Sequence, residues 1–384
     1  MKIYKKIHSS IYSLLRDVFI KLCTFIPVSS KYIFFESEID FAENSRAIYE
    51  YMRDNPEYRK YHMVWNVKEP EKYTEEKNVK FISIDRNSVQ WYFYLNRCKY
   101  FIFTHPYWLK TWKKDQIVIN SWHGNPFKAP PQKPLKNVFN TMIASSEDGV
   151  RFRRKEFIGD FEIAVLGAPR IDFLLNKKYD KNYLSEFVDT NNYEKIIFCM
   201  PTYKKSQNQQ DGQRNNPYSI NVISSDSELL ELNDELRSRK VLLVCIIHHL
   251  QKMDDMIASQ LSNIMYMRDD DYAQKGIVMN QMLRCADALV TDFSGVFLDY
   301  ILLDRPIGFF CNDRDQYTRG FAMDNPEDYM PGYHMYTIDD FISFVCDVCE
   351  GKDDFIEFRK CVRDRVHTYQ DDQNCERFLR YFGI

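Results

Sequence analysis

The sequence predicts an α/β protein made of two Rossmann-like domains that face each other across a cleft. Three observations lead to this fold class. Apolar strand-like runs alternate with helical patterns from Lys31 onward, and the alternation pauses at a polar stretch over residues 177–194 before it restarts. The length of 384 residues also exceeds what one hydrophobic core usually supports. We therefore expect domains at 29–176 and 177–384, preceded by a helix over residues 1–28.

The individual elements follow from the same patterns. In the first half, short apolar runs predict strands over residues 31–37, 62–67, 79–83, 100–104, 117–121, 141–145 and 163–166, with helices over 45–55 and 86–96 among them. In the second half, we expect strands over residues 195–200, 241–247, 264–267, 288–291, 307–310 and 335–337. Helical patterns cover residues 296–303, 338–349 and 355–369, and a short last helix ends at Phe382.

The N-terminal segment has apolar side chains at helical spacing between residues 7 and 26, with lysines ahead of it. Arg16, Asp17 and Lys21 interrupt the apolar run, which excludes a membrane-spanning helix. Two interpretations remain, an amphipathic helix on an anionic membrane surface and a helix docked on the protein's own core. We expect the membrane helix, because basic residues flank its apolar stripe.

Composition excludes several classes of function. A net charge of −3 leaves no excess of basic residues for bulk nucleic-acid binding. The ten cysteines lie mostly in apolar runs, which is typical of reduced thiols rather than of a disulfide framework. Cys346 and Cys349 form a CxxC pair inside a helical pattern with no second pair nearby, so we interpret them as structural. The sequence has no Walker loop, GxGxxG motif or zinc spacing, and we expect no metal and no cofactor.

The strongest chemical signal is the sequence SWHGNPFK at residues 121–128, directly after a predicted strand. It places the imidazole of His123 at the carboxyl edge of a sheet, where open α/β folds bind ligands. Gly124 allows a tight turn and the approach of a ligand, and Lys128 adds a positive charge. The structural alternative is that His123 only satisfies local hydrogen bonds.

Further polar residues follow strands in the same way. The sequence TDFSG at residues 291–295 opens a predicted helix, whose free N–H groups would suit a phosphate. Alternatively, Ser294 is a plain N-cap with no ligand. Other polar side chains after predicted strands are Arg170, Thr202, His248 and His249.

Taken together, these motifs resemble the CDP-glycerol:poly(glycerophosphate) glycerophosphotransferase family of teichoic-acid and capsule enzymes. The resemblance runs from about residue 35 to 378. It rests on NSRAIYEY at 44–51, WHGNPFK at 122–128, GAPR at 167–170 and TDFSGVFLDY at 291–300, with RP at 305–306, RGF at 319–321, PG at 331–332 and ER at 376–377. The chain departs from the family pattern at Asn125, Phe127, His249, Gly295 and Tyr333, which leaves the alditol and the acceptor open.

The resemblance implies a GT-B-like fold and a peripheral protein on the cytoplasmic face of the bacterial cell membrane. It implies transfer of glycerol phosphate or ribitol phosphate from CDP-glycerol or CDP-ribitol to a hydroxyl of a lipid-linked teichoic-acid or capsular acceptor, releasing CMP. His123 would act as base, His248 would hold the diphosphate, and Asp292 would orient a histidine or accept from a hydroxyl. The residues expected to bind substrate are Gly124, Lys128, Arg170, Thr202, Ser294, Gly295 and Arg305.

Two other functions stay open. A nucleotide-sugar glycosyltransferase of the same architecture would share the phosphate-binding helix but would not need the Trp-His-Gly sequence. A catalytically silent membrane scaffold would need none of His123, His248 and Asp292. The expected partners are the CDP-alditol, the lipid-linked acceptor and an anionic membrane surface, with no nucleic acid, and a homo-oligomer is compatible with the sequence.

Overall fold

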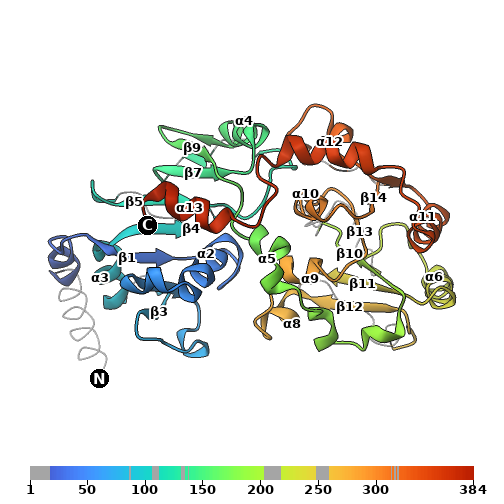
Figure 1. The fold of residues 1–384 in the computed structure, drawn as a ribbon, viewed down its shortest axis with the longest axis horizontal. Coiled ribbons are helices and arrows are strands. Elements are labelled where there is room, and N and C mark those ends of the chain that lie inside the picture. The colour runs from blue at the N-terminus through green and yellow to red at the C-terminus, as the bar shows by residue number, and fades with distance from the viewer. Residues whose placement is uncertain are drawn as a thin grey trace, which may run out of the picture.

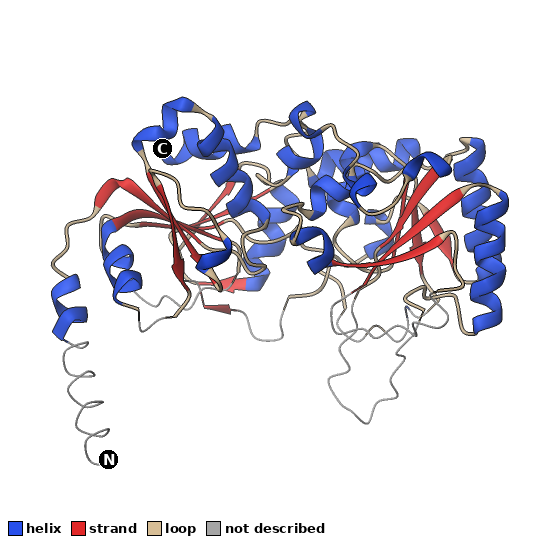
Figure 2. Ribbon diagram, turned by 90° about the horizontal axis from the view of Figure 1, so that it is seen from below, coloured by secondary structure: helices blue, strands red, loops and turns tan. Residues whose placement is uncertain are grey.

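The protein contains two separate parallel sheets, one in each half of the chain (Figure 1; Figure 2). The computed structural model describes residues 18–85, 88–105, 112–130, 135–136, 138–202, 218–247, 259–312, 314, 317 and 320–384. The α/β class and the two-sheet architecture predicted from the sequence are confirmed.

The first sheet has seven strands in the order β3-β2-β1-β4-β5-β7-β9, and all neighbours pair in parallel. Its strands are β1 (Ser29–Phe35), β2 (His62–Val67), β3 (Val79–Ser83), β4 (Cys98–Phe103), β5 (Ile117–Asn120), β7 (Thr141–Ala144) and β9 (Glu162–Val165). The sheet is buried on both faces, since Ile33 and Phe35 of β1 join one apolar cluster and Phe34 joins another. A small pair, β6 (Leu135–Lys136) and β8 (Phe157–Ile158), lies beside it and was not predicted.

The second sheet has six parallel strands in the order β12-β11-β10-β13-β14-β15. Its strands are β10 (Lys195–Cys199), β11 (Val241–Ile247), β12 (Ile264–Arg268), β13 (Ala288–Thr291), β14 (Ile307–Phe310) and β15 (Tyr333–Met335). Parallel strands need crossover connections, and the helices on both faces of the two sheets supply the covering layers.

The described α-helices are α2 (Glu43–Asp54), α3 (Val89–Arg97), α4 (Glu147–Glu156), α5 (Ile171–Leu175), α6 (Asp226–Ser238), α8 (Asp269–Ala273), α9 (Met279–Leu283), α10 (Phe297–Tyr300), α11 (Ile338–Glu350), α12 (Ile356–Val366) and α13 (Asn374–Phe382). Short 3-10 helices are η1 (Pro56–Lys60), η2 (Pro70–Lys72), η3 (Lys177–Tyr179), η4 (Tyr183–Glu186), η5 (Thr190–Asn192), η6 (Ile301–Leu303) and η8 (Pro326–Tyr329).

Two segments cross between the halves of the molecule. Helix α13 returns to the first sheet (Figure 1), where Phe378 and Leu379 enter the core formed by β1, β2 and α2. In the other direction, the loop after β5 carries Phe127 into the core of the second half, where its ring packs edge-on against Phe297 at 4.9 Å between centroids. The end of the chain therefore packs with the first sheet, and the domain limits expected at residues 176 and 177 stay a prediction.

The described part of the N-terminal segment begins at Val18, and residues 18–23 are helical. Residues 1–17 of the expected amphipathic helix lie outside the described residues. Cys23 is buried, whereas Val18, Leu22 and Phe25 keep 49%, 60% and 82% of their surface exposed. None of the described helices is long and apolar enough to cross a membrane.

Candidate active site

His123 lies at the carboxyl edge of the first sheet, immediately beyond β5, as the sequence predicts. Its Nδ1 is 2.9 Å from the carbonyl oxygen of Thr104 and 3.1 Å from Oε2 of Glu38. Because a carbonyl and a carboxylate can only accept, Nδ1 carries the proton in the neutral ring. This leaves Nε2 with a free lone pair, which is the arrangement that a general base requires.

The environment of His123 favours the neutral imidazole. Burial by the surrounding protein lowers the pKa of His123, Glu38 opposes this by raising it, and Arg153 and Arg170 lower it further. The side chain still keeps 36% of its surface exposed. A molecule from solvent can therefore reach a ring that is held at one nitrogen.

The turn that presents His123 is strained at Trp122, which has a φ of +53°. Asn44 holds this turn by donating to the carbonyl oxygens of Ser121 and Trp122 at 2.7 and 2.9 Å. The Arg153 guanidinium lies over the Trp122 ring at 4.9 Å. The sequence placed the tight turn at Gly124, but the left-handed residue is Trp122, and a Cβ added at Gly124 would meet nothing within 4 Å.

Carboxylates line the same edge of the first sheet. The half-buried carboxyl of Glu43 accepts a hydrogen bond from the hydroxyl of Thr104, and desolvation by the surrounding protein raises the pKa of Glu43 to about 7. Glu36 is 3% exposed and lies 3.1 Å from Nε2 of His105. Sequence reasoning missed Glu38 and Glu43. Glu38 follows a predicted strand in the same way as His123, and that position was the available signal.

In the second half, Asp292 follows β13 and is fully buried. One carboxylate oxygen accepts the backbone N–H of Thr202 at 2.7 Å, and the other has no hydrogen-bond partner among the described residues. The hydroxyl of Thr202 is likewise buried without a described partner. Buried polar atoms are normally satisfied, so these two groups point to a ligand or to neighbouring residues that complete the site.

The TDFSG sequence meets the WHGNP sequence in space. A Cβ added at Gly295 would lie 3.1 Å from the backbone oxygen of Asn125, so the two loops approach closely at this glycine. The helix α10 begins at Phe297, one residue after the predicted start, and its N-cap is Val296, so Ser294 lies two residues ahead of the cap position. The plain N-cap interpretation of Ser294 is therefore wrong, and the N–H groups of Ser294 and Gly295 belong to the loop before α10 and not to the helix start that the sequence predicted there.

Arg170 has a different setting from the one expected for a substrate ligand. Its guanidinium binds Asp299 through two hydrogen bonds of 2.7 Å, and both side chains are buried. Burial alone would raise the pKa of Asp299, but Arg170 outweighs it and the pKa is lowered. Since Arg170 follows β9 and Asp299 belongs to α10, this pair ties the two halves of the molecule together.

The remaining residues predicted to belong to the site are Lys128, Arg305 and His248. Lys128 forms a backbone bridge with Phe321 in the loop that crosses into the second half. Arg305 precedes β14, and its Nη1 donates to the carbonyls of Arg284 and Ala286. It therefore lies at the amino edge of the sheet, away from Asp292, and its assignment to substrate binding is corrected. His248 lies outside the described residues.

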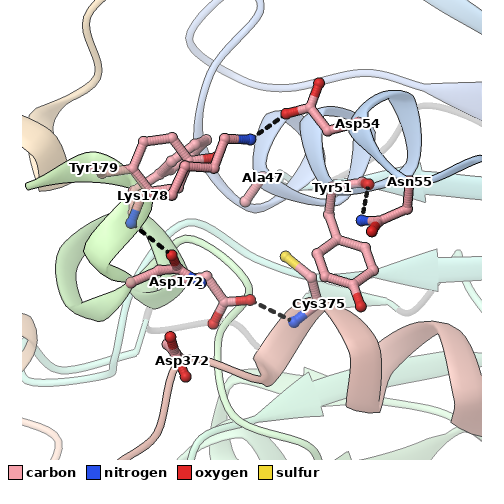
Figure 3. Close-up of a pocket in the computed structure, with 11 residues that line it drawn as sticks. Ala47, Tyr51, Asp54, Asn55, Asp172, Lys178, Tyr179, Asp372 and Cys375 are labelled. Carbon is pink, nitrogen blue, oxygen red and sulfur yellow. Dashed lines mark hydrogen bonds and ion pairs between the residues drawn. The ribbon is translucent and has the colours of Figure 1, made fainter.

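One cavity among the described residues is not lined by His123. It has a volume of about 390 Å³ and lies between α2, α5 and the start of α13 (Figure 3). Figure 3 shows three of its charged side chains in contacts: Lys178 binds Asp54, and Asp172 accepts from the backbone N–H of Cys375 at 2.8 Å. The cavity has no histidine in its lining, and we do not assign the reaction to it.

No group of three or more His, Cys, Asp or Glu side chains could hold a metal ion within the part of the chain that the structure describes. The expectation that the reaction needs no metal and no cofactor stays a prediction.

Comparison with known proteins finds relatives that are named as teichoic acid transferases and polymerases. The chain is 25% identical over 413 residues to a teichoic acid glycerol-phosphate transferase of Staphylococcus aureus, covering 98% of each protein. It is 27% identical over 336 residues to a teichoic acid poly(glycerol phosphate) polymerase of Staphylococcus epidermidis, where the match covers 79% of this chain and 44% of the polymerase. The chain thus matches less than half the length of that polymerase.

Solved structures agree on the fold. The wall teichoic acid polymerase TagF superposes with a TM-score of 0.73 at 22% identity, covering 99% of this chain and 97% of that one. A UDP-N-acetylglucosamine 2-epimerase homologue from Listeria monocytogenes gives a TM-score of 0.51 at 12% identity over 92% of this chain and 96% of that one. The family model for CDP-glycerol:poly(glycerophosphate) glycerophosphotransferases matches residues 18–382, and this chain therefore belongs to that family.

Proposed function

We propose that this protein transfers glycerol phosphate or ribitol phosphate from a CDP-alditol to a hydroxyl of a lipid-linked teichoic-acid or capsular acceptor, releasing CMP. Family membership supports the reaction class. Relatives named as glycerol-phosphate and ribitol-phosphate polymerases support both alditols. The observation that carries the proposal is the imidazole of His123, whose Nδ1 is held by Thr104 and Glu38 and whose Nε2 is free to accept a proton.

In this mechanism the acceptor oxygen forms a bond to the β-phosphorus while the bond from that phosphorus to the CMP oxygen breaks. The acceptor proton moves to Nε2 of His123, and CMP leaves with the electron pair of the broken bond. The neutral ring can take this proton because the pKa of His123 is lowered, chiefly by burial. The strained turn at Trp122 fixes the direction of the ring.

The donor is proposed to lie against the second half of the molecule. The diphosphate would accept from the backbone N–H groups of Ser294 and Gly295, which lie beside the loop that carries His123, since Gly295 closely approaches Asn125. The buried hydroxyl of Thr202, which has no partner among the described residues, would extend this site as a donor, while the unpartnered carboxylate oxygen of Asp292 would accept from a hydroxyl or orient a histidine. Lys128 would add positive charge, and the family resemblance adds His248.

Replacing Ser294 with alanine should weaken CDP-alditol binding by about 1–2 kcal/mol, the free energy of a hydrogen bond to a charged group. Isothermal calorimetry with CDP-glycerol measures this change. Ser185→Ala, on an exposed serine of the second half, serves as the control and should leave the affinity unchanged. Equal donor affinity in Ser294→Ala and the parent protein would remove the Ser294 hydroxyl from the donor site.

An assay of nucleotide release tests the reaction class. Release of CMP from CDP-glycerol or CDP-ribitol, dependent on a lipid-linked acceptor, supports the proposal. Turnover of UDP-sugars in its place would favour a glycosyltransferase, and turnover of neither would favour the scaffold.

We also propose that the N-terminal segment binds the cytoplasmic surface of an anionic membrane. Leu22 and Phe25 are 60% and 82% exposed, so inserting them into a lipid interface would remove apolar surface from water. The double variant Leu22→Asp, Phe25→Asp should lose binding to anionic vesicles by at least about tenfold in co-sedimentation. Leu230→Asp, on an exposed residue of α6, should bind normally. Unfolding of the double variant in circular dichroism would instead assign the segment to the core.

A further inference from the structure

Glu38 contacts His123 through its side chain and Thr104 through its backbone. Its Oε2 lies 3.1 Å from Nδ1 of His123, and its backbone N–H donates to the hydroxyl of Thr104 at 3.0 Å. The carbonyl of Thr104 is the other acceptor for Nδ1, at 2.9 Å. The segment after β1 and the segment after β4 thus hold one nitrogen of His123 from two sides.

The support behind these contacts is buried. Thr104 is fully buried, and its hydroxyl donates to the carboxyl of Glu43 while it accepts from Glu38. Because this hydroxyl has a partner on each side, the backbone of Glu38 is fixed relative to β4. The carboxylate of Glu38 is 55% exposed, so it faces the open side of His123 and not the core.

Building on the proposed function, we propose that Glu38 is a positioning residue for the reaction, which keeps the proton of His123 on Nδ1 and stabilises the imidazolium formed when Nε2 takes the acceptor proton. The proton transferred is the hydroxyl proton of the acceptor, and it leaves His123 to solvent after CMP departs. Glu38 takes no part in the proton transfer itself and acts as a hydrogen-bond acceptor and a nearby negative charge.

The surroundings of His123 oppose its protonated ring, so a nearby negative charge is needed to stabilise the imidazolium. Arg153 of α4 and Arg170 before α5 both oppose the imidazolium, and burial opposes it more strongly. Among the groups that influence His123, Glu38 and the carbonyl of Thr104 favour the charged ring. Trp122 stacks on the ring with centroids 4.6 Å apart and adds no charge. Glu38 is therefore the described carboxylate that offsets the two arginines.

The decisive variants are Glu38→Gln and Glu38→Asp. Glutamine keeps an acceptor for Nδ1 but removes the charge, and aspartate keeps the charge at a longer distance. We expect Glu38→Gln to lower kcat by about 10–100-fold, the scale that the loss of a hydrogen bond between two charged groups gives in a rate. The KM for CDP-alditol and the melting temperature should change little, because Glu38 belongs to the first half and is half exposed. Glu38→Asp should recover part of the lost kcat.

A titration of the free protein by NMR, with the histidines isotopically labelled and the His123 signal assigned from His123→Ala, gives a second readout. Removing a carboxylate beside an imidazole destabilises its protonated form. Glu38→Gln should therefore move the midpoint for His123, and with it the acid limb of the kcat/KM profile, to lower pH. Glu71→Gln, on an exposed glutamate of the same half, should move neither.

The two readouts separate this inference from the proposed function. If His123→Ala is inactive but Glu38→Gln changes neither the His123 midpoint nor kcat, the role of Glu38 is overturned and the base assignment stands. If Glu38→Gln moves the midpoint but His123→Ala turns over normally, the base assignment fails and the positioning role fails with it. A shifted midpoint together with a lowered kcat supports both.

Discussion

Replacing His123 with alanine is expected to slow CMP release by about 10²–10⁴-fold, the usual contribution of a general base. The variant loses Nε2, the atom proposed to take the acceptor proton. Donor affinity should stay near the parent value, because the proposed donor groups at Ser294 and Gly295 belong to the second half of the molecule. Single-turnover rates with radiolabelled CDP-glycerol, measured on a preparation whose melting temperature is also recorded, give the result directly.

His62→Ala is the matched control. His62 begins β2 at the opposite edge of the same sheet and stacks on Tyr32 with centroids 4.6 Å apart. It should therefore alter stability without slowing the chemical step. A His123→Ala protein that is folded and turns over normally, or one that is unfolded, would assign His123 to bracing the turn after β5.

The pH profile provides an independent check on His123. A base must be deprotonated, so activity falls as pH decreases through the pKa of the imidazole. Because burial lowers that pKa from its usual value of 6.5, the acid limb of kcat/KM should lie below about pH 6.5. An acid limb above pH 6.5 would mean that Glu38 raises the pKa of His123 by more than burial, Arg153 and Arg170 together lower it.

Much of the fold was predictable because parallel strands buried on both faces give continuous apolar runs. The predicted limits of β2, β3, β11, β13 and β14 coincide with the observed ones. The order of strands in each sheet was not predictable, since it depends on contacts between residues far apart in sequence. The return of α13 to the first sheet was unpredictable for the same reason. Phe378 and Leu379 show that one face of their helix is apolar, but not which sheet that face packs against.

The candidate site was predictable where one strand delivers one residue to the sheet edge. His123 and Asp292 both directly follow predicted strands, and the structure places both at carboxyl edges. The pairing of His123 with Glu38 was not visible, because it joins the segments after β5 and β1. The assignment of Arg305 to substrate binding rested on the resemblance alone. Its position just before a parallel strand already indicated the amino edge of the sheet.

The pair Arg170–Asp299 is expected to have the largest effect on stability. It joins the segment after β9 to α10, with side chains 7% and 9% exposed, and Asp299 also accepts from Asn280 at 3.2 Å. Asp299→Ala leaves the guanidinium of Arg170 buried without its partner, which typically costs about 3–5 kcal/mol. Chemical denaturation should show this loss in the free energy of unfolding.

The cost should come from the unpaired charge and not from the lost side-chain volume. The double variant Arg170→Met, Asp299→Leu removes both charges and should recover much of the stability, since apolar replacement of a buried ion pair is often neutral or stabilising. Glu194→Ala breaks the exposed pair with Lys240, at 2.9 Å, and should change stability little. If Asp299→Ala unfolds like the parent protein, the pair is not what holds the halves together. If the double variant is as unstable as Asp299→Ala, then the geometry of the hydrogen bonds, and not the uncompensated charge, carries the connection between the two sheets.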